Sequence, residues 1–343
     1  KYPHLDNLII SENTATSTLA KGGGLYSSYN IFPTISNTTI ENNASTGLNT
    51  MGGGIYNDHY HSVTYNNCLI RGNDSPFHPV KFVGGHTSYL TMNDCEITDN
   101  NYTTSDMNNT ESVVIEVGAA LKNVLIANNN GKTELLTMTV SFENVTIANN
   151  GEGVYIDGNI YSGDPSITIK NSIIANNGDD PYQQLVPSPG NEFEVDLYVD
   201  YSLVQGSAWI DSLEGSELII STVGDGCMTQ LEDPRFVNPD FSNYRLLASS
   251  LCINAAHPDS TDNDGTRLDM GVYPYLNTYS GPTWYVEPAG NDTTGTGASD
   301  SPFASIQSAI NFATTTSDSV TVAAGTYIEN INFRGRNIKV VGA

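Results

Sequence analysis

Four aspartates near residue 260 are arranged in a pattern that can bind a divalent cation. They surround a turn at Gly265, and they are Asp259, Asp262, Asp264 and Asp269. Carboxylate oxygens are the ligands that calcium prefers, and a glycine allows the backbone to bend sharply between them. The spacing is not that of an EF-hand, whose loop ends in a glutamate. We expect either a calcium site, calcium being the only cofactor indicated, or a turn held by Arg267 and the aspartate side chains.

Two tyrosines at equivalent places in the sequence are candidates for contact with a carbohydrate. Tyr26 and Tyr56 each follow a Gly-Gly-Gly run, and the two runs lie thirty residues apart. His59, Tyr60 and His61 follow shortly after the second run. The tyrosines predict either an aromatic strip for a ligand or a stack of rings that only closes the fold. The histidines are a weak metal candidate because an H-x-H pair supplies no third ligand.

Charged side chains give little sign of catalysis. Glu41 and Arg71 are thirty residues apart, and in a repeating fold they would be neighbours that contact a ligand or form a surface ion pair. Hydrolysis of a polysaccharide needs two carboxylates beside the scissile bond, and a lyase needs calcium and a basic side chain. Asp179-Asp180 is an acidic motif, but a solvated turn explains it as well. No catalytic residue is therefore predicted, and an enzyme would have to use loops such as 73–81 or 100–111.

The element that must position these residues is a repeat. The pattern N-x-x-I-x-x-N occurs eight times at spacings of 21 to 30 residues, centred on Ile10, Ile40, Ile70, Ile97, Ile126, Ile147, Ile174 and Val204. The leading position holds Asn7, Asn37, Asn67, Asp94, Asn123, Asn144, Asn171 and Tyr201. The trailing position holds Asn13, Asn43, Asn73, Asn100, Asn129, Asn150 and Asn177, with Ser207 last. Such self-similarity is typical of a solenoid.

The period-two pattern inside each repeat indicates a short strand with one buried face. The central residue and the residue two before it share a face, and both are apolar or small in almost every copy. One short strand cannot bury its face, but stacked coils can. We therefore predict an all-β, right-handed, single-stranded parallel β-helix in which asparagines permit the turns and form a structural ladder. Cys68 and Cys95 share an inward position on consecutive coils, as a disulfide or as two buried thiols.

The repeats resemble those of a known group of proteins. NLIISEN, KGGGLY, NTTIENN, GGGIYND, NVTIANN and NSIIANN are similar to pectate-lyase-like β-helix repeats of bacterial surface and secreted proteins, including polymorphic outer-membrane proteins. The resemblance covers about residues 5–210. It implies a β-helix, and it implies polysaccharide or a cell-surface glycan as partner.

The last part of the chain resembles the start of a second β-helix. Residues 201–273 resemble the terminating region of secreted β-helix proteins, which places a boundary near residue 278. Residues 279–343 resemble the N-terminal cap and first coil of another β-helix, with Ser301-Pro302 starting an amphipathic helix over about 303–314. Short strands are expected at 284–286, 319–322 and 337–341. We therefore expect 1–278 and 279–343 to be pieces of two β-helices in a longer tandem polypeptide that continues end to end.

The composition limits the classes of partner and the cellular location that we expect for the protein. The chain has 13 Lys and Arg against 38 Asp and Glu, a formal net charge of −25, which argues against nucleic acid as a partner. No apolar run in the sequence is long enough to cross a bilayer. The acidic, Asn-rich composition favours an extracellular or cell-surface protein of bacterial type. Two functions remain: non-catalytic display, adhesion or glycan binding, which the lack of stacked carboxylates favours, and a polysaccharide lyase or glycoside hydrolase acting on acidic polysaccharide.

Overall fold

The computed structural model divides the chain into two compact units, Lys1–Glu232 and Asp233–Ala343. It describes residues 3–28, 33–47, 49–59, 62–85, 88–103, 110–136, 139–157, 166–180, 184–187, 195–206, 219–229 and 232–342. The two units are taken in turn.

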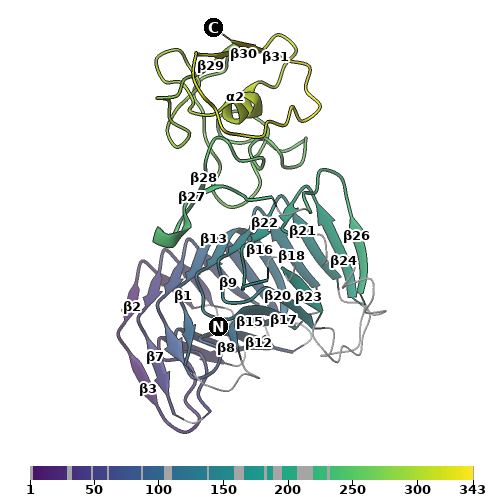
Figure 1. Cartoon of the computed structure of the whole chain (residues 1–343). Coiled ribbons are helices and arrows are strands. Elements are labelled where there is room, and N and C mark those ends of the chain that lie inside the picture. The colour runs from purple at the N-terminus through teal and green to yellow at the C-terminus, as the bar shows by residue number, and fades with distance from the viewer. Residues whose placement is uncertain are drawn as a thin grey trace. The chain divides into compact units, whose positions relative to one another are not determined.

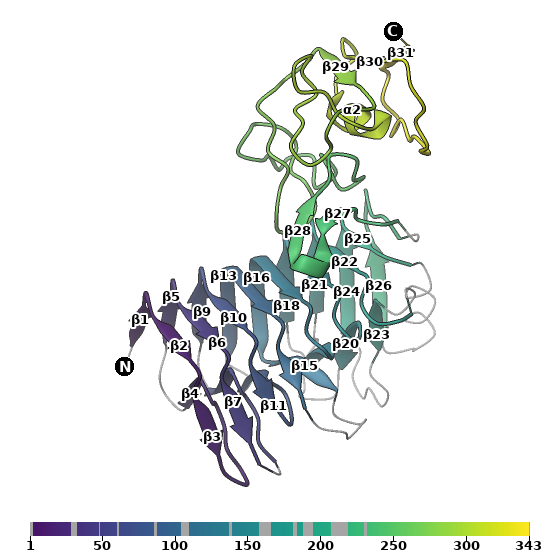
Figure 2. The ribbon, with the colours of Figure 1, turned by 60° about the vertical axis from the view of Figure 1, so that its left-hand side comes forward.

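The first unit is a right-handed parallel β-helix whose strands stack in register from coil to coil (Figures 1 and 2). The strands form four stacks. The first contains β1 (His4–Asp6), β5 (Thr34–Ser36), β9 (Val63–Asn66), the first halves of β13 (Tyr89–Thr98) and β16 (Gly118–Ala127), β18 (Thr139–Glu143), β21 (Ser166–Lys170), β24 (Val195–Asp200) and β26 (Ile219–Val223). The second contains β2 (Ile9–Ser11), β6 (Thr39–Glu41), β10 (Leu69–Arg71), the second halves of β13 and β16, β19 (Thr146–Ala148), β22 (Ile173–Ala175) and β25 (Leu203–Val204).

The other two stacks differ in length. The third contains β3 (Thr14–Thr16), β7 (Ala44–Thr46), β11 (Asp74–Ser75) and β14 (Asn101–Tyr102). The fourth contains β4 (Leu25–Ser28), β8 (Ile55–His59), β12 (Val80–Gly84), β15 (Glu111–Glu116), β17 (Lys132–Leu136), β20 (Val154–Asp157) and β23 (Leu185–Pro187). The third stack ends at β14 while the fourth continues, so the later coils are built without a third strand among the described residues.

Left-handed residues make the bends between the first three stacks. The leading residue of the repeat has positive φ in all eight copies, from Asn7 to Tyr201, as predicted for a turn. The second bend falls two residues after the central residue, at Glu12, Asn42, Gly72, Asp99, Asn128, Asn149, Asn176 and Gly206. The prediction that the trailing Asn itself makes this turn was wrong by one residue. The trailing Asn has its side chain inside the coil, and the residue before it adopts the left-handed conformation.

The trailing asparagines form a continuous buried ladder. Asn43, Asn73, Asn100, Asn129, Asn150 and Asn177 are each at most 3% exposed, whereas Asn13 in the first coil is exposed. Each side-chain amide donates to the Oδ1 of the next Asn at 2.9–3.1 Å. From Asn43 onward it also donates to the carbonyl of the central Ile of the preceding coil. Gln184 ends the ladder, because its Oε1 accepts from the Asn177 amide at 2.9 Å.

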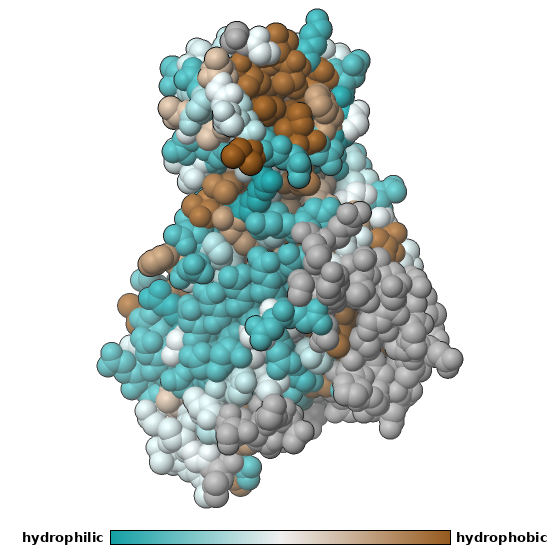
Figure 3. Space-filling view, in the orientation of Figure 1, coloured by the Kyte–Doolittle hydropathy of each residue, from teal (hydrophilic) through white to brown (hydrophobic). Residues whose placement is uncertain are grey.

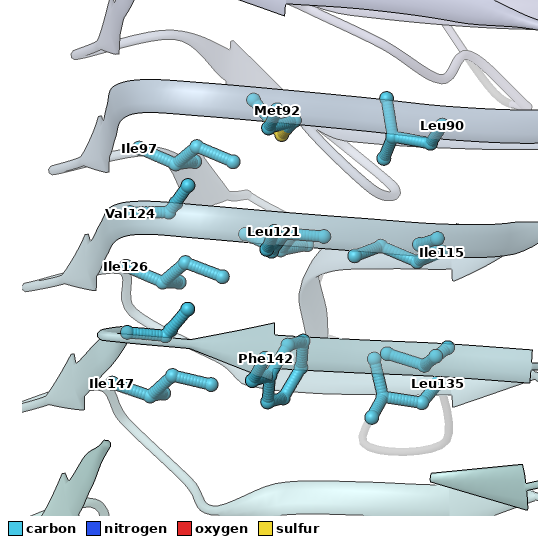
Figure 4. Close-up of a cluster of buried hydrophobic side chains, with 14 of the residues drawn as sticks. Leu90, Met92, Ile97, Ile115, Leu121, Val124, Ile126, Leu135, Phe142 and Ile147 are labelled. Atoms are coloured by element: carbon cyan, nitrogen blue, oxygen red, sulfur yellow. The ribbon is translucent and has the colours of Figure 1, made fainter. Parts of the chain in front are cut away.

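The apolar core fills the inside of the coils. The central column is completely buried from Ile40 to Val204, and its partner column from Thr38 to Ser202 is at most 3% exposed, which confirms the predicted inward face. Side chains from different stacks meet in this interior, as Leu90, Met92, Ile97, Ile115, Leu121 and Phe142 do in Figure 4. The short strands are thus stabilised by stacking and burial together.

The second unit has its own small sheet and a single helix. Two antiparallel strands, β27 (Phe236–Asn238) and β28 (Asn243–Leu246), flank the 3₁₀ helix η1 (Pro239–Phe241). A parallel sheet follows in the order β29 (Thr283–Val286), β30 (Ser319–Val322) and β31 (Lys339–Gly342), with α2 (Ile306–Phe312) packed on β29 and β30. In the orientation of Figure 3, hydrophilic side chains cover much of the first unit and apolar ones gather on part of the second. The large exposed apolar residues of the second unit are Phe241, Leu276, Ile328, Ile331, Phe333 and Val341.

The helix of the second unit begins later than predicted. Ser301-Pro302 was expected to start it, but its N-cap is Ser305, whose hydroxyl accepts from the Ser308 N–H at 3.3 Å. Phe303 is extended and pairs with β29: its N–H donates to the Tyr285 carbonyl, and its own carbonyl accepts from the Glu287 N–H, each at 3.0 Å. A residue bonded to a strand in this way cannot join a helix. The three predicted strands are present, the last shifted to Lys339–Gly342.

The boundary expected near residue 278 lies inside the second compact unit. Asn311 of α2 donates to the carbonyls of Ala248 and Ser250, which connects the segments on both sides of residue 278. The division into pieces of two tandem β-helices stays a prediction. Within the described ranges, no helix has the length and apolar character needed to span a membrane.

Candidate functional site

The outer face of the fourth stack carries the two predicted tyrosines. Tyr26 and Tyr56 are register partners on β4 and β8, with ring centroids 6.1 Å apart. Tyr26 is 48% exposed, while Tyr56 is 6% exposed and lies beneath the Lys21 ammonium, whose nitrogen is 4.5 Å from the ring centroid. The strip therefore presents one open ring, and the stacked pair fits both interpretations of the sequence.

The other residues predicted to contact a ligand do not all lie beside Tyr26 and Tyr56. His59 is the last residue of β8, but its side chain, and Tyr60 and His61 altogether, lie outside the described residues. Glu41 and Arg71 are register partners on β6 and β10 of the second stack, and their charged atoms are 2.8 Å apart. They form the expected ion pair, in a different stack from Tyr26 and Tyr56.

A cluster of charged residues that the sequence did not reveal continues the tyrosine row. Register pairing leads from Tyr56 to Lys81, Val114, Glu134 and Tyr155 in successive coils. Lys132 lies at the centre: its Nζ is 3.0 Å from Glu111 Oε1, 3.2 Å from Glu134 Oε1 and 4.4 Å from the centroid of the Tyr155 ring. Lys81 pairs with Glu116 at 2.7 Å on the neighbouring strands. We call the outward side chains of β4, β8, β12, β15, β17 and β20 the fourth-stack face.

The charged groups of this face are largely shielded from solvent. The side chains of Lys132, Glu111 and Glu134 are 14%, 6% and 13% exposed. Burial opposes the charge on Lys132, but Glu134 and Glu111 outweigh it and raise the pKa of the amine. Burial raises the pKa of Glu134 against the opposing effect of Lys132. Lys132 is therefore protonated at neutral pH and lies between two carboxylates.

One edge of the cluster has unsatisfied polar atoms. His78 Nδ1 and Glu111 Oε2 are 3.4 Å apart, yet both atoms are buried without a hydrogen-bond partner. Burial, and then the charge of Lys81, lower the pKa of His78 to about 3, so its ring is neutral at pH 7 and the contact is not an ion pair. Both atoms therefore keep hydrogen-bonding capacity that no described residue satisfies.

The Gly-Gly-Gly motif before Tyr26 and Tyr56 does not mark the later members of the row. Residues 83–86 contain the similar Val-Gly-Gly-His, but Val83 pairs with Asp58 and Lys81 takes the place of Tyr56. Residues 151–155 contain Gly-Glu-Gly-Val-Tyr, and there Tyr155 does lie in the row. The usable signal was the Val80–Lys81 pair, which fits the inside-outside alternation of a strand.

Asp262, Asp264 and Asp269 of the predicted calcium site lie close enough to affect one another's charge, but they are not arranged as a metal-binding group. Asp262 accepts from the Asp269 N–H, and Asp269 accepts from the N–H groups of Asn254 and Tyr275. Asp264 accepts from Thr266 and Asn277, and Asp259 is exposed. Across the described ranges, no group of three or more His, Cys, Asp or Glu side chains is arranged to hold a metal ion.

These aspartates instead organise the backbone. Arg267 donates to the carbonyls of Ala255 and Ala256. These bonds are of the kind expected for a turn held by Arg267 and aspartate side chains, which was the alternative to a calcium site. Burial, with the nearby charge of Asp262, raises the pKa of Asp269 to about 8.

Two further sequence motifs have structural surroundings. Asp179 and Asp180 are exposed, as a solvated turn requires. Cys68 and Cys95 are free thiols inside consecutive coils, where the hydrogen bond between them lowers the pKa of Cys68 and raises that of Cys95. Cys68 also donates to the carbonyls of Ile35 and Asn66.

No family model, curated protein or solved structure matches this chain. The parallel β-solenoid is established by the strand pairing itself. The resemblance to pectate-lyase-like and outer-membrane-protein repeats stays a prediction.

Proposed function

We propose that the protein is an extracellular or cell-surface solenoid of bacterial type that binds a glycan on the fourth-stack face without cleaving it. The supporting observation is the row formed by Tyr26, Tyr56, Lys81, Val114, Glu134 and Tyr155, in which rings or charges occupy equivalent positions of successive coils except at the buried Val114. Coils of a parallel sheet are about 4.8 Å apart, so the row offers repeated contacts to a repeated ligand. A polysaccharide has this character.

The chemistry of the face suits polar recognition better than bond cleavage. A lyase needs a side chain that accepts a proton at neutral pH, whereas Lys132 is held protonated by its two carboxylates. Carboxylate, ammonium and imidazole groups can all bond to sugar hydroxyls. Display and adhesion of this kind require only an accessible surface.

Binding can be tested with a variant that leaves the fold intact. Tyr26→Ala removes a half-exposed ring, and Tyr198→Ala is a matched control because Tyr198 is 44% exposed on β24 of the first stack. We expect affinity electrophoresis in gels containing a panel of neutral and acidic polysaccharides to retard the native protein. Tyr26→Ala should weaken retardation several-fold and Tyr198→Ala should not. Equal retardation of all three proteins would reject the fourth-stack face.

Hydrolysis of a glycan is a second candidate, supported by one specific observation. Glu111 and Glu134 both contact Lys132 and therefore lie within about 6 Å of each other, which is near the separation of the carboxylate pair in glycoside hydrolases. The raised pKa of Glu134 suits a proton donor. Release of reducing ends that is lost in Glu134→Gln, with polysaccharide binding retained, would replace the non-catalytic proposal.

A further inference from the structure

The second unit contains a cavity separate from the fourth-stack face. Its volume is about 480 Å³, and it lies between the 254–280 segment, β29 and the residues that follow α2. Tyr279, Trp284 and Phe312 give it aromatic walls, and Arg267 and Arg336 give it two guanidinium groups. A pocket of this size holds a small ligand, and one with mixed aromatic and polar walls can orient it.

Two buried side chains of the cavity wall have unsatisfied polar atoms. Trp284 is 3% exposed and its Nε1–H has no acceptor in the protein. Asn254 is 2% exposed and its Oδ1 has no donor, although its Nδ2 donates to the Asn311 carbonyl. A buried donor or acceptor without a partner costs about 1–3 kcal/mol. The fold thus maintains one donor and one acceptor that its own residues do not use.

Arg336 is a cationic side chain in the wall of the cavity. Arg336 donates to the carbonyls of Ile310 and Ala313 at the end of α2, and it has no ion pair with a described residue. Burial, followed by the charges of Arg334 and Arg267, lowers the pKa of Arg336 to about 9, so it remains a cation at neutral pH. An anion at this position would relieve the repulsion among the three guanidinium groups.

The acidic residues of the wall are already bonded. Asp264 accepts from the Thr266 and Asn277 N–H groups, and Asp318 accepts from the Thr315 N–H. Both carboxylates are therefore oriented by the backbone. With Arg267 and Arg336 they make the formal charge of the lining zero, so a ligand carboxylate has to be recognised locally by Arg336, which lacks an ion pair with a described residue, while hydroxyls meet the remaining polar atoms.

We propose that this cavity binds a carboxylated monosaccharide unit, such as a uronic acid, as a second glycan site in addition to the fourth-stack face. The sugar ring packs against the aromatic walls, the carboxylate meets Arg336, and hydroxyls bond to Trp284 Nε1–H and Asn254 Oδ1. A neutral sugar would lack the charged contact, and a simple carboxylate would lack the contact with the rings.

The test uses isothermal titration of the full chain with galacturonic acid, galactose and acetate. We expect galacturonic acid to bind at least about tenfold more tightly than the other two, since only it combines the charge-assisted bond with the ring contact. Equal affinity for galactose, equal affinity for acetate, or no heat with any of the three would overturn the proposal.

Two variants separate the cavity from general stability. Trp284→Phe keeps an aromatic ring but removes the indole N–H, so the affinity should drop about tenfold, whereas the lost buried volume beside Phe303 and Phe312 should lower the melting temperature only slightly. Thr278→Trp places a bulky side chain at an exposed rim residue and should abolish binding. Unchanged affinity in both variants would exclude this cavity, whatever the outcome for Tyr26 on the fourth-stack face.

Discussion

Asn100 illustrates what one residue does in this fold. Its amide donates to the carbonyls of Ile70 and Thr98 and to Asn129 Oδ1, and its own Oδ1 accepts from Asn73. All of these groups are buried, so each bond satisfies an atom that water cannot reach. The leading asparagines are different, because Asn67 donates to Asn37 on the exposed surface. The trailing asparagines should therefore contribute more to the stability of the fold than the leading asparagines.

We expect Asn100→Leu to destabilise the first unit by about 2–4 kcal/mol, because several buried donors and acceptors lose their partner at once. Urea unfolding followed by circular dichroism measures this. Asn67→Gly is the matched control: glycine accepts the φ of 50° that Asn67 adopts, and the lost bond is exposed, so the cost should stay under about 1 kcal/mol. Similar costs for the two variants would contradict the buried ladder.

At the residue scale the sequence predicted the columns better than the site. Asn and Ile recur at fixed offsets, and the inside-outside alternation then determines which of them is buried. Lys81 and Glu134 follow no motif, and they become neighbours of the tyrosine row only because coils of different length stay in register. The ladder ends at Gln184, only seven residues after Asn177, and no repeat predicts that a loop side chain would take the next position.

At the scale of elements, α2 shows how a strand contact overrides a helix signal. Ser301-Pro302 is a good local start, but Phe303 is committed to pairing with β29. The helix therefore begins after Ser305, and Glu329 from a distant loop accepts from the N–H groups of Ile306 and Gln307 at 2.7 and 2.9 Å. Apolar spacing predicted the helix itself, whereas its first residue depended on tertiary contacts.

Removing the Ser305 hydroxyl should destabilise the second unit by about 1 kcal/mol, which is typical of a lost N-cap. Ser305→Ala would be compared with Ser301→Ala in thermal unfolding followed by Trp fluorescence, since Trp284 reports on this unit. Ser301 should matter less, because the Thr296 N–H also bonds to its backbone carbonyl at 3.0 Å. A larger loss in Ser301→Ala would favour the original sequence prediction.

In the first unit as a whole, each coil is a repeating unit that contributes separately to the stability. Coils contact their neighbours through parallel strands, and Ser36 and Asn66 are register partners that precede equivalent bends at Asn37 and Asn67. Stability in such a repeat is approximately a sum of coils and their interfaces. Loop lengths between the strands can then vary without changing the register.

Deleting residues 37–66 should therefore leave a folded, shorter solenoid, because the cut joins equivalent positions of two coils. Circular dichroism should retain its strand signal and a cooperative melt. A deletion of half this length, 37–51, joins non-equivalent positions, so the coil before the cut should lose its pairing and the strand signal should fall more than after the full-coil deletion. Loss of folding after the full-coil deletion would show that the coils are not interchangeable.

The asparagine ladder also makes each coil depend on the coil that follows it in the chain. From Asn43 onward each ladder amide donates one N–H to the preceding coil and one to the next, so a coil whose successor has not yet folded keeps an unmet donor. In a chain that folds as it is synthesised, the newest coil would therefore be the one with an unmet bond. Gln184 ends the ladder, because it supplies the acceptor for Asn177 only seven residues later, although further strands still stack beyond it.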